Sequence, residues 1–310
     1  MIVSARSWQN PNSYFPQFPR PPLFVKRRRY FVHAAHRFSR ISLIRTVTAV
    51  LLSAVGLGCA IPAFAFDCAK AAKPVEKKIC ANKSLLSADE QMNAAYSKLL
   101  KSAPDAEIRE MLVRSQRRWI DARNTGLDGD LQGNSLSAGE VRKQIAERTR
   151  LLQDQSDKGL IAIAQRERQW LAKYAGGPFS GFAADCSFIP NDRSGTTVSY
   201  TCFGAVHVQN HDRVCSQSQD FASWQTDMYS TVSRVDGGTV HAQAYCDSQS
   251  NACNDGSSKA GWVRAAKADG EDRFPVPASG MPRLDAEMWS LVDSAWFNNC
   301  LTTPQYPAGL

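Results

Sequence analysis

The chain has 310 residues, a hydrophobic fraction of 43% and a formal net charge of +8. The basic excess lies at its start, because residues 1–65 carry nine Lys or Arg and no Asp or Glu. The remaining residues are 28 basic and 29 acidic. Nucleic acid is therefore not an expected partner, since such binding needs a basic face on the folded domain.

Residues 46–65 form an uncharged, mostly apolar run that ends in Ala63-Phe64-Ala65, the pattern read by signal peptidase. This predicts cleavage near Ala65, a periplasmic or secreted protein, and no membrane span after cleavage. About 45 residues of this leader precede the run, and Pro and aromatic residues dominate the first 25 of them, so we expect that segment to be disordered. A translation start further along the chain is one explanation of its length.

Three alternatives to simple cleavage stay open at this point. Arg28-Arg29 resembles a twin-arginine signal, Cys59 is a candidate lipoprotein cysteine, and the uncharged run has the length of a membrane anchor. Against them, the arginine pair lies far from the apolar run. Gly56 stands where a lipoprotein signal usually has Leu, and Pro62 disfavours a helix.

Eight cysteines follow the leader, an even number that allows every thiol to pair in an oxidising compartment. They are Cys68, Cys80, Cys186, Cys202, Cys215, Cys246, Cys253 and Cys300.

Residues 66–177 have the pattern of a helical bundle. Ser87-Ala88-Asp89-Glu90 reads as a capping box, and Met92, Tyr96 and Leu99 follow it on one helical face. Further helices are expected over residues 104–124, 137–152 and 161–174, with a polar loop over 125–137.

Within this half, four residues have the spacing Cys-x11-Cys-x8-Asp-x6-Tyr, and a Gln, a Trp and an Arg follow on the next helix. Over about residues 66–153 the pattern resembles the LprI-like N-terminal domain, a family named for a bacterial lysozyme-inhibitor lipoprotein. The matching residues besides the cysteines are Glu76, Leu85, Asp89, Tyr96, Gln116, Trp119 and Arg123. The resemblance implies a non-enzymatic inhibitor. Unlike usual members, this chain has no cysteine in residues 124–141, so a second disulfide is missing there.

The matched residues also have physical roles of their own. Cys68 and Cys80 flank one short helical segment and are expected to tie it to the chain start, contributing about 3 kcal/mol. Trp119 is expected in the core. Arg123 lies one turn further, where it can cover Trp119 or pair with a carboxylate such as Asp89.

Residues 178–310 contain six of the eight cysteines and read as a separate, disulfide-rich α+β domain. Alternation predicts a strand over 198–208, a hairpin of residues 228–235 and 239–246, and a short strand at 262–264. One amphipathic helix is expected over 284–296. Among the fifteen possible pairings of six cysteines, Cys246 with Cys253 is our first choice.

No catalytic, cofactor or metal site is expected, because the chain lacks the Gly-x-Ser-x-Gly, His-Glu-x-x-His and phosphate-loop motifs. His207 and His211 are interpreted as surface residues. Three aromatic residues that a sugar platform would need are assigned to the core instead, namely Trp224, Tyr229 and Trp262.

These features favour an exported, non-enzymatic binding protein that resembles lysozyme inhibitors. Its partner is then lysozyme or another envelope protein, and an acidic patch of Asp105, Glu107 and Glu110 is the candidate contact for a basic target. The alternative is an envelope module that binds glycan or peptidoglycan, or has a housekeeping role.

Overall fold

The computed structural model describes residues 68–128, 135–191, 197–222, 225–247, 253, 259–265, 277–292 and 295–310. The expected export signal, with Arg28-Arg29, Cys59 and Ala65, lies outside these residues. Within them, no helix combines the length and the apolar character that crossing a membrane requires.

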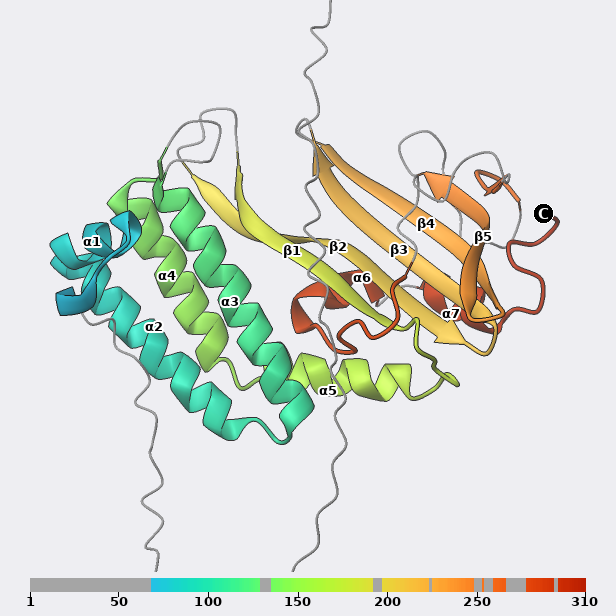
Figure 1. Cartoon of the computed structure of the whole chain (residues 1–310), viewed down its shortest axis with the longest axis horizontal. Coiled ribbons are helices and arrows are strands. Elements are labelled where there is room, and N and C mark those ends of the chain that lie inside the picture. The colour runs from blue at the N-terminus through green and yellow to red at the C-terminus, as the bar shows by residue number, and fades with distance from the viewer. Residues whose placement is uncertain are drawn as a thin grey trace, which may run out of the picture. The chain divides into compact units, whose positions relative to one another are not determined.

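The first half of the described chain is helical, as expected. It consists of the short 3-10 helix η1 (Cys68–Lys70) and the α-helices α1 (Pro74–Ala81), α2 (Lys83–Ser102), α3 (Ala106–Asp128), α4 (Ala138–Gln153) and α5 (Leu160–Leu171). Figure 1 shows α2, α4 and α3 side by side, with α5 at the bottom of the view.

The start of α2 corrects one prediction. The Asn82 side chain accepts hydrogen bonds from the backbone N–H groups of Ser84 and Leu85, so it is the N-cap and α2 begins at Lys83. Ser87 therefore lies inside α2, and the capping box expected there is wrong.

Other helix ends follow the sequence more closely. The side chains of Asp105 and Ser137 each accept a hydrogen bond from the backbone N–H three residues further on, so α3 and α4 begin where expected. The far ends differ, since α3 continues to Asp128 and α5 stops at Leu171.

The second half is one antiparallel sheet in which each strand pairs with its sequence neighbour, in the order β1-β2-β3-β4-β5-β6. Its strands are β1 (Gly181–Pro190), β2 (Val198–Asn210), β3 (Arg213–Ala222), β4 (Gln225–Asp236), β5 (Thr239–Asp247) and β6 (Val263–Arg264). The strands expected near 198–208, 228–235, 239–246 and 262–264 are present, whereas β1 and β3 were not expected.

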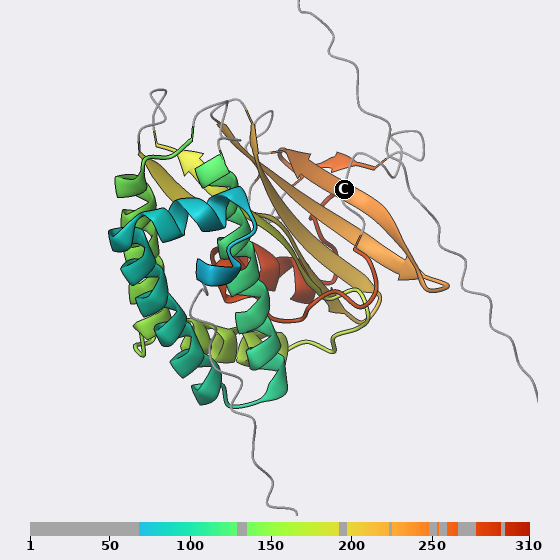
Figure 2. The same cartoon turned by 60° about the vertical axis from the view of Figure 1, so that its left-hand side comes forward.

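The C-terminal helical segment is divided differently from the single helix expected over 284–296. It contains η2 (Ala286–Met288), α6 (Trp289–Val292) and α7 (Ala295–Thr302). The Asp285 side chain accepts a hydrogen bond from the backbone N–H of Glu287 and so starts η2. Figure 2 shows these red helices between the helical layer and the sheet.

The helices and the sheet share one continuous hydrophobic cluster. The rings of Trp119 on α3 and Phe188 on β1 meet edge to face with their centroids 6.3 Å apart. Side chains of α4 also satisfy the start of β2, because Gln144 donates to the carbonyl of Val198 and Glu140 accepts from its N–H. The chain therefore has a helical part and a sheet part that contact each other closely.

All eight described cysteines are disulfide-bonded. The pairs are Cys68–Cys80, Cys186–Cys202, Cys215–Cys300 and Cys246–Cys253. The first and last are the two pairings expected from the sequence. Of the others, Cys186–Cys202 joins opposite residues of β1 and β2, and Cys215–Cys300 joins β3 to α7.

Candidate functional site

The helical half is organised around a buried ion pair between Asp89 on α2 and Arg123 on α3. Arg123 also lies over the Trp119 ring, with its guanidinium carbon 5.8 Å from the ring centroid. Both interactions that the sequence suggested for Arg123 are therefore present. Burial raises the pKa of Asp89, although the charge of Arg123 opposes the shift.

The other matching residues mostly support this core. Leu85 and Gln116 are buried, and Tyr96 is partly buried against the cluster. Glu76 lies near the surface, where its carboxylate accepts hydrogen bonds from the backbone N–H groups of Ala72 and Lys73 and stabilises the start of α1. These bonds lower the pKa of Glu76. The matching residues therefore build the scaffold and expose little side-chain surface to a partner.

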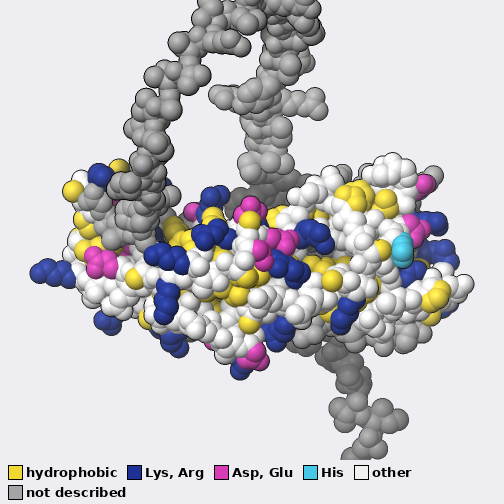
Figure 3. Space-filling model, turned by 90° about the horizontal axis from the view of Figure 1, so that it is seen from below, with side chains coloured by type: hydrophobic (Ala, Val, Ile, Leu, Met, Phe, Trp, Pro, Cys, Tyr) yellow, Lys and Arg dark blue, Asp and Glu magenta, His cyan; other side chains and the backbone are white. Residues whose placement is uncertain are grey.

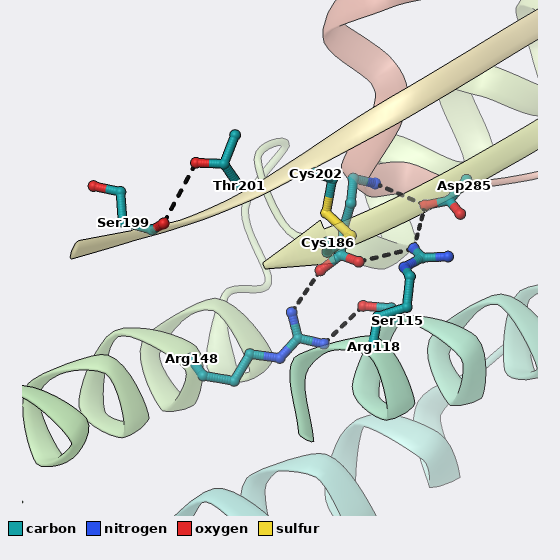
Figure 4. The surroundings of a disulfide bond; sticks show 9 residues. Ser115, Arg118, Arg148, Cys186, Ser199, Thr201, Cys202 and Asp285 are labelled. Carbon is teal, nitrogen blue, oxygen red and sulfur yellow. Dashed lines mark hydrogen bonds and ion pairs between the residues drawn. A yellow bond between two sulfur atoms is a disulfide. The ribbon is translucent and has the colours of Figure 1, made fainter. Parts of the chain in front are cut away.

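A second buried polar network joins the helices to the C-terminal segment. Arg148 on α4, whose side chain is 1% exposed, donates to Gln116 Oε1, Ser115 Oγ and Glu287 Oε1 at 3.0, 2.7 and 2.7 Å. Figure 4 shows Arg148, Ser115, Arg118 and Asp285 converging beside the Cys186–Cys202 disulfide. This convergence fixes η2 against α3 and α4.

Arg118 on α3 extends the same network. It donates to Asp285 Oδ1 at 2.7 Å and to Glu287 Oε2 at 2.9 Å. Burial opposes the positive charge of Arg118, but the two carboxylates more than offset it and raise its pKa.

Glu167 on α5 contacts this network through a backbone group. Its Oε2 accepts a hydrogen bond of 2.7 Å from the backbone N–H of Asp285, while its Oε1 has no hydrogen-bond partner among the described residues. Burial raises the pKa of Glu167 to about 8, and the nearby Asp285 carboxylate adds to the rise. The shift favours the protonated form of Glu167 in the folded protein at neutral pH.

One group of side chains in the described part of the chain has the spacing of a metal site. The sulfur atoms of Cys186 and Cys202 and a carboxylate oxygen of Glu287 lie within 4.8 Å of one another. The two sulfurs are bonded to each other, so they are not thiolates, and Glu287 is held by two arginines. The donor set does not fit a metal ion.

The histidines differ from expectation. His207 is 2% exposed on β2, opposite Ser216 of β3, and its Nδ1 is 2.7 Å from Ser216 Oγ. Its interpretation as a surface residue is wrong, and burial lowers its pKa to about 4. His211 is exposed in the turn after β2, with φ of 56°.

The expected acidic patch is largely neutralised. Arg168 donates to both oxygens of Asp105, at 2.8 and 3.0 Å, and to Glu107 at 3.0 Å. These bonds with Arg168 lower the pKa of Asp105 to about 2. Glu110, in contrast, is exposed and makes no ion pair with any described residue.

Two of the three aromatic residues that were expected in the core lie among the described residues. Trp262 is buried and stacks on Trp296 with centroids 6.1 Å apart, as expected for a core residue. Tyr229 is partly buried, and Trp224 lies outside the described residues.

The residues that the sequence interpretation missed are charged groups that meet only after folding. Arg148 lies on the apolar stripe of α4 with Val141 and Ile145, and this position was the available signal that its side chain is buried. Nothing local indicated that Glu287 is its partner, or that Asp285 pairs with Arg118, since both carboxylates are more than a hundred residues away.

No curated protein and no solved structure matches the chain. A family model does match, and the match ends before the first strand of the sheet. The part of the chain from η1 to three residues beyond α4, residues 68–156, matches the family of lysozyme inhibitor LprI.

Proposed function

We propose that this chain is an exported, non-enzymatic binding protein whose helical half binds lysozyme and blocks it. The observation that carries the proposal is the family match over residues 68–156, which coincides with the helices that surround the Asp89–Arg123 ion pair. Four disulfides support residence in an oxidising compartment.

An inhibitor of this kind needs a fixed surface and no reactive group. The buried polar residues of the helical half are used for internal contacts, so the target has to be contacted by exposed residues of α1 to α4. A rigid scaffold reduces the conformational entropy that binding costs, and the ion pair and the Cys68–Cys80 disulfide supply that rigidity.

The exposed face of α3 carries two carboxylates that are available to a basic target, with the exposed Arg117 between them. Glu110 and Asp121 are both exposed, lie three turns apart on the same side of the helix, and form no ion pair with any described residue. Figure 3 shows acidic and basic side chains interspersed on the face seen from below, so steering by a single continuous acidic surface is not expected there. Instead of such a surface, the two carboxylates on α3 provide a local contact for a basic lysozyme.

The direct experiment is inhibition of cell-wall lysis by the mature protein, with c-type, g-type and i-type lysozymes. We expect at least one lysozyme to be inhibited stoichiometrically, because a binder without chemistry must occupy its target one for one. Titration should saturate at a fixed molar ratio. Failure to inhibit all three at micromolar concentration would refute the proposal.

Paired charge reversals then locate the contact. Glu110→Lys with Asp121→Lys should slow association with a basic lysozyme by about threefold to tenfold at low salt. Asp220→Lys with Asp236→Lys is the matched control, because both residues are exposed on the sheet, on β3 and β4, and the net charge changes by the same amount. Equal effects of both changes would mean that only overall charge matters.

A further inference from the structure

A hollow of about 650 Å³ is lined by residues of β3, β4, β5, β6 and the C-terminal segment. Val232 on β4 and Ala244 on β5 contribute to its lining, as do six residues of the C-terminal segment: Pro304, Gln305, Tyr306, Pro307, Gly309 and Leu310. Figure 1 shows this red C-terminal segment beside β5. We propose that the hollow is a binding site for an acidic oligosaccharide, in which arginines bind the sugar carboxylates.

The first support for this proposal is the arginines. Arg213, Arg234 and Arg264, from three different strands, all line the hollow. Arg213 and Arg234 are directly opposite each other on β3 and β4, and like charges in that position repel. A bound anion between them would remove that repulsion.

The three guanidinium groups differ in how they are held. Arg213 donates to the carbonyl oxygens of Cys300, Thr303 and Pro304 at the end of α7, so its position is fixed without neutralising its charge. Arg234, with 67% of its side chain exposed, forms an exposed ion pair of 3.0 Å with Asp212 and no other ion pair with a described residue. Such pairs contribute about 0–1 kcal/mol and exchange easily for a ligand carboxylate.

Arg264 is the most available of the three. It is exposed on β6 and forms no ion pair with any described residue. Guanidinium groups bind carboxylates through two parallel hydrogen bonds. The arginines of the hollow are therefore better suited to a planar carboxylate than to a small spherical anion.

The charge of the hollow is opposite to that of its surroundings. Residues 156–310 contain 12 basic and 16 acidic side chains. Among the described residues that line the hollow, three arginines face one acidic side chain, Asp212. A local positive site on an acidic half is a specific feature and does not follow from composition.

The neutral lining favours a sugar over other acidic ligands of similar size. Ser233, Gln243 and Gln305 bring a hydroxyl and two amides, groups that both donate and accept hydrogen bonds as sugar hydroxyls require. A second hollow of about 370 Å³ shares Asp212 and Arg213 with the first, so a ligand of several sugar units has room to extend. This site is separate from the α3 surface proposed for lysozyme.

The test is calorimetric titration of the mature protein with tri-galacturonate and with a hyaluronan tetrasaccharide. We expect binding of at least one of them and weaker binding of methyl-esterified tri-galacturonate, which has the same rings without the charges. Arg234→Gln with Arg264→Gln should weaken binding by about tenfold to a hundredfold. Both side chains are exposed, so the variant is expected to fold, and its melting temperature checks this.

Arg142→Gln with Arg150→Gln is the matched control, because both arginines are exposed on α4 and the net charge changes equally. Unchanged affinity in this control together with loss in the hollow variant supports the site. The proposal is overturned if neither acidic sugar binds at millimolar concentration, or if both double variants weaken binding equally. It is also overturned if tri-glutamate binds more tightly than the sugars, since the site would then be one for acidic peptides.

Discussion

At the scale of single residues, the helical half buries charges that most helical bundles leave at the surface. Asp89 and Arg123 are 1% and 5% exposed, so both lost most of their hydration on folding. Their mutual attraction, the hydrogen bond from Asn93 to Asp89 and the Trp119 ring compensate for that loss. A pair of this kind fixes the register of α2 against α3 more than it adds net stability.

Removing one partner should therefore be costly. Asp89→Ala leaves Arg123 buried and uncompensated, and we expect the free energy of unfolding to fall by about 3–5 kcal/mol. Glu147→Ala, which removes the exposed partner of Arg150, should cost less than about 1 kcal/mol. Urea unfolding of the three proteins measures both values, and similar losses in the two variants would contradict the structural role of Asp89.

Glu167 gives a prediction about pH. Its pKa is raised to about 8 from an ordinary value of 4.5, so the folded protein holds this proton more tightly than the unfolded chain does. Below pH 4.5 both states are protonated and stability is unaffected. Between pH 4.5 and 8 the unfolded chain releases the proton first, so the free energy of unfolding decreases as pH rises through this window.

Glu167→Gln should remove that decrease. We expect the native protein to lose at least about 1 kcal/mol between pH 5 and pH 8 through this group, and the variant to lose less. Glu147→Gln on the exposed face of α4 is the control and should keep the native pH dependence. Urea titrations at pH 5 and pH 8 measure the free energy of unfolding of each protein. If Glu167→Gln loses as much stability between these pH values as the native protein does, Glu167 is ionised when folded.

At the scale of elements, the sequence predicted what local chemistry determines. Pro104 with the acidic residues after it, and the Ser137 segment, predicted the starts of α3 and α4, and the alternation of apolar and polar residues predicted β2. Ser87 was misread because Asn82 caps α2 one turn earlier. β3 gave no signal, since its central residues Ser216, Gln217 and Ser218 are polar on both faces and nevertheless buried.

The disulfides should differ in how much they stabilise the fold, according to the length of the loop that each one closes. Cys215–Cys300 closes a long loop, with a sequence separation of 85, whereas Cys246–Cys253 has a separation of 7. By chain entropy the first contributes about 4–5 kcal/mol and the second about 2–3 kcal/mol.

Paired Cys→Ala variants test this order. The variant lacking Cys215–Cys300 should melt at a lower temperature than the variant lacking Cys246–Cys253. Non-reducing mass spectrometry confirms that the remaining three pairs are intact in each. The opposite order would show that the loop near Cys253 contributes more to the fold than its length indicates.

At the scale of the whole molecule, the two halves could be recognised from composition, but their interface could not. The Arg148 network joins α4 to η2 across 139 residues, and no periodic pattern connects positions so far apart. The same holds for the arginine-lined hollow, because its three arginines come from β3, β4 and β6. Functional candidates in this chain depend on tertiary contacts, which explains why no short sequence motif marks them.

The shared contacts lead to a last prediction, on the independence of the helical half. Residues 66–177 have their own caps, apolar stripes and a disulfide, so we expect them to fold alone as a helical domain. Separation would expose the face of Trp119 that meets Phe188 and would leave Arg148 without Glu287. The isolated half should therefore give a helical far-ultraviolet spectrum and melt well below the intact protein. A disordered spectrum would show that the halves fold only together, and an unchanged melting temperature would show that the interface adds no stability to the helices.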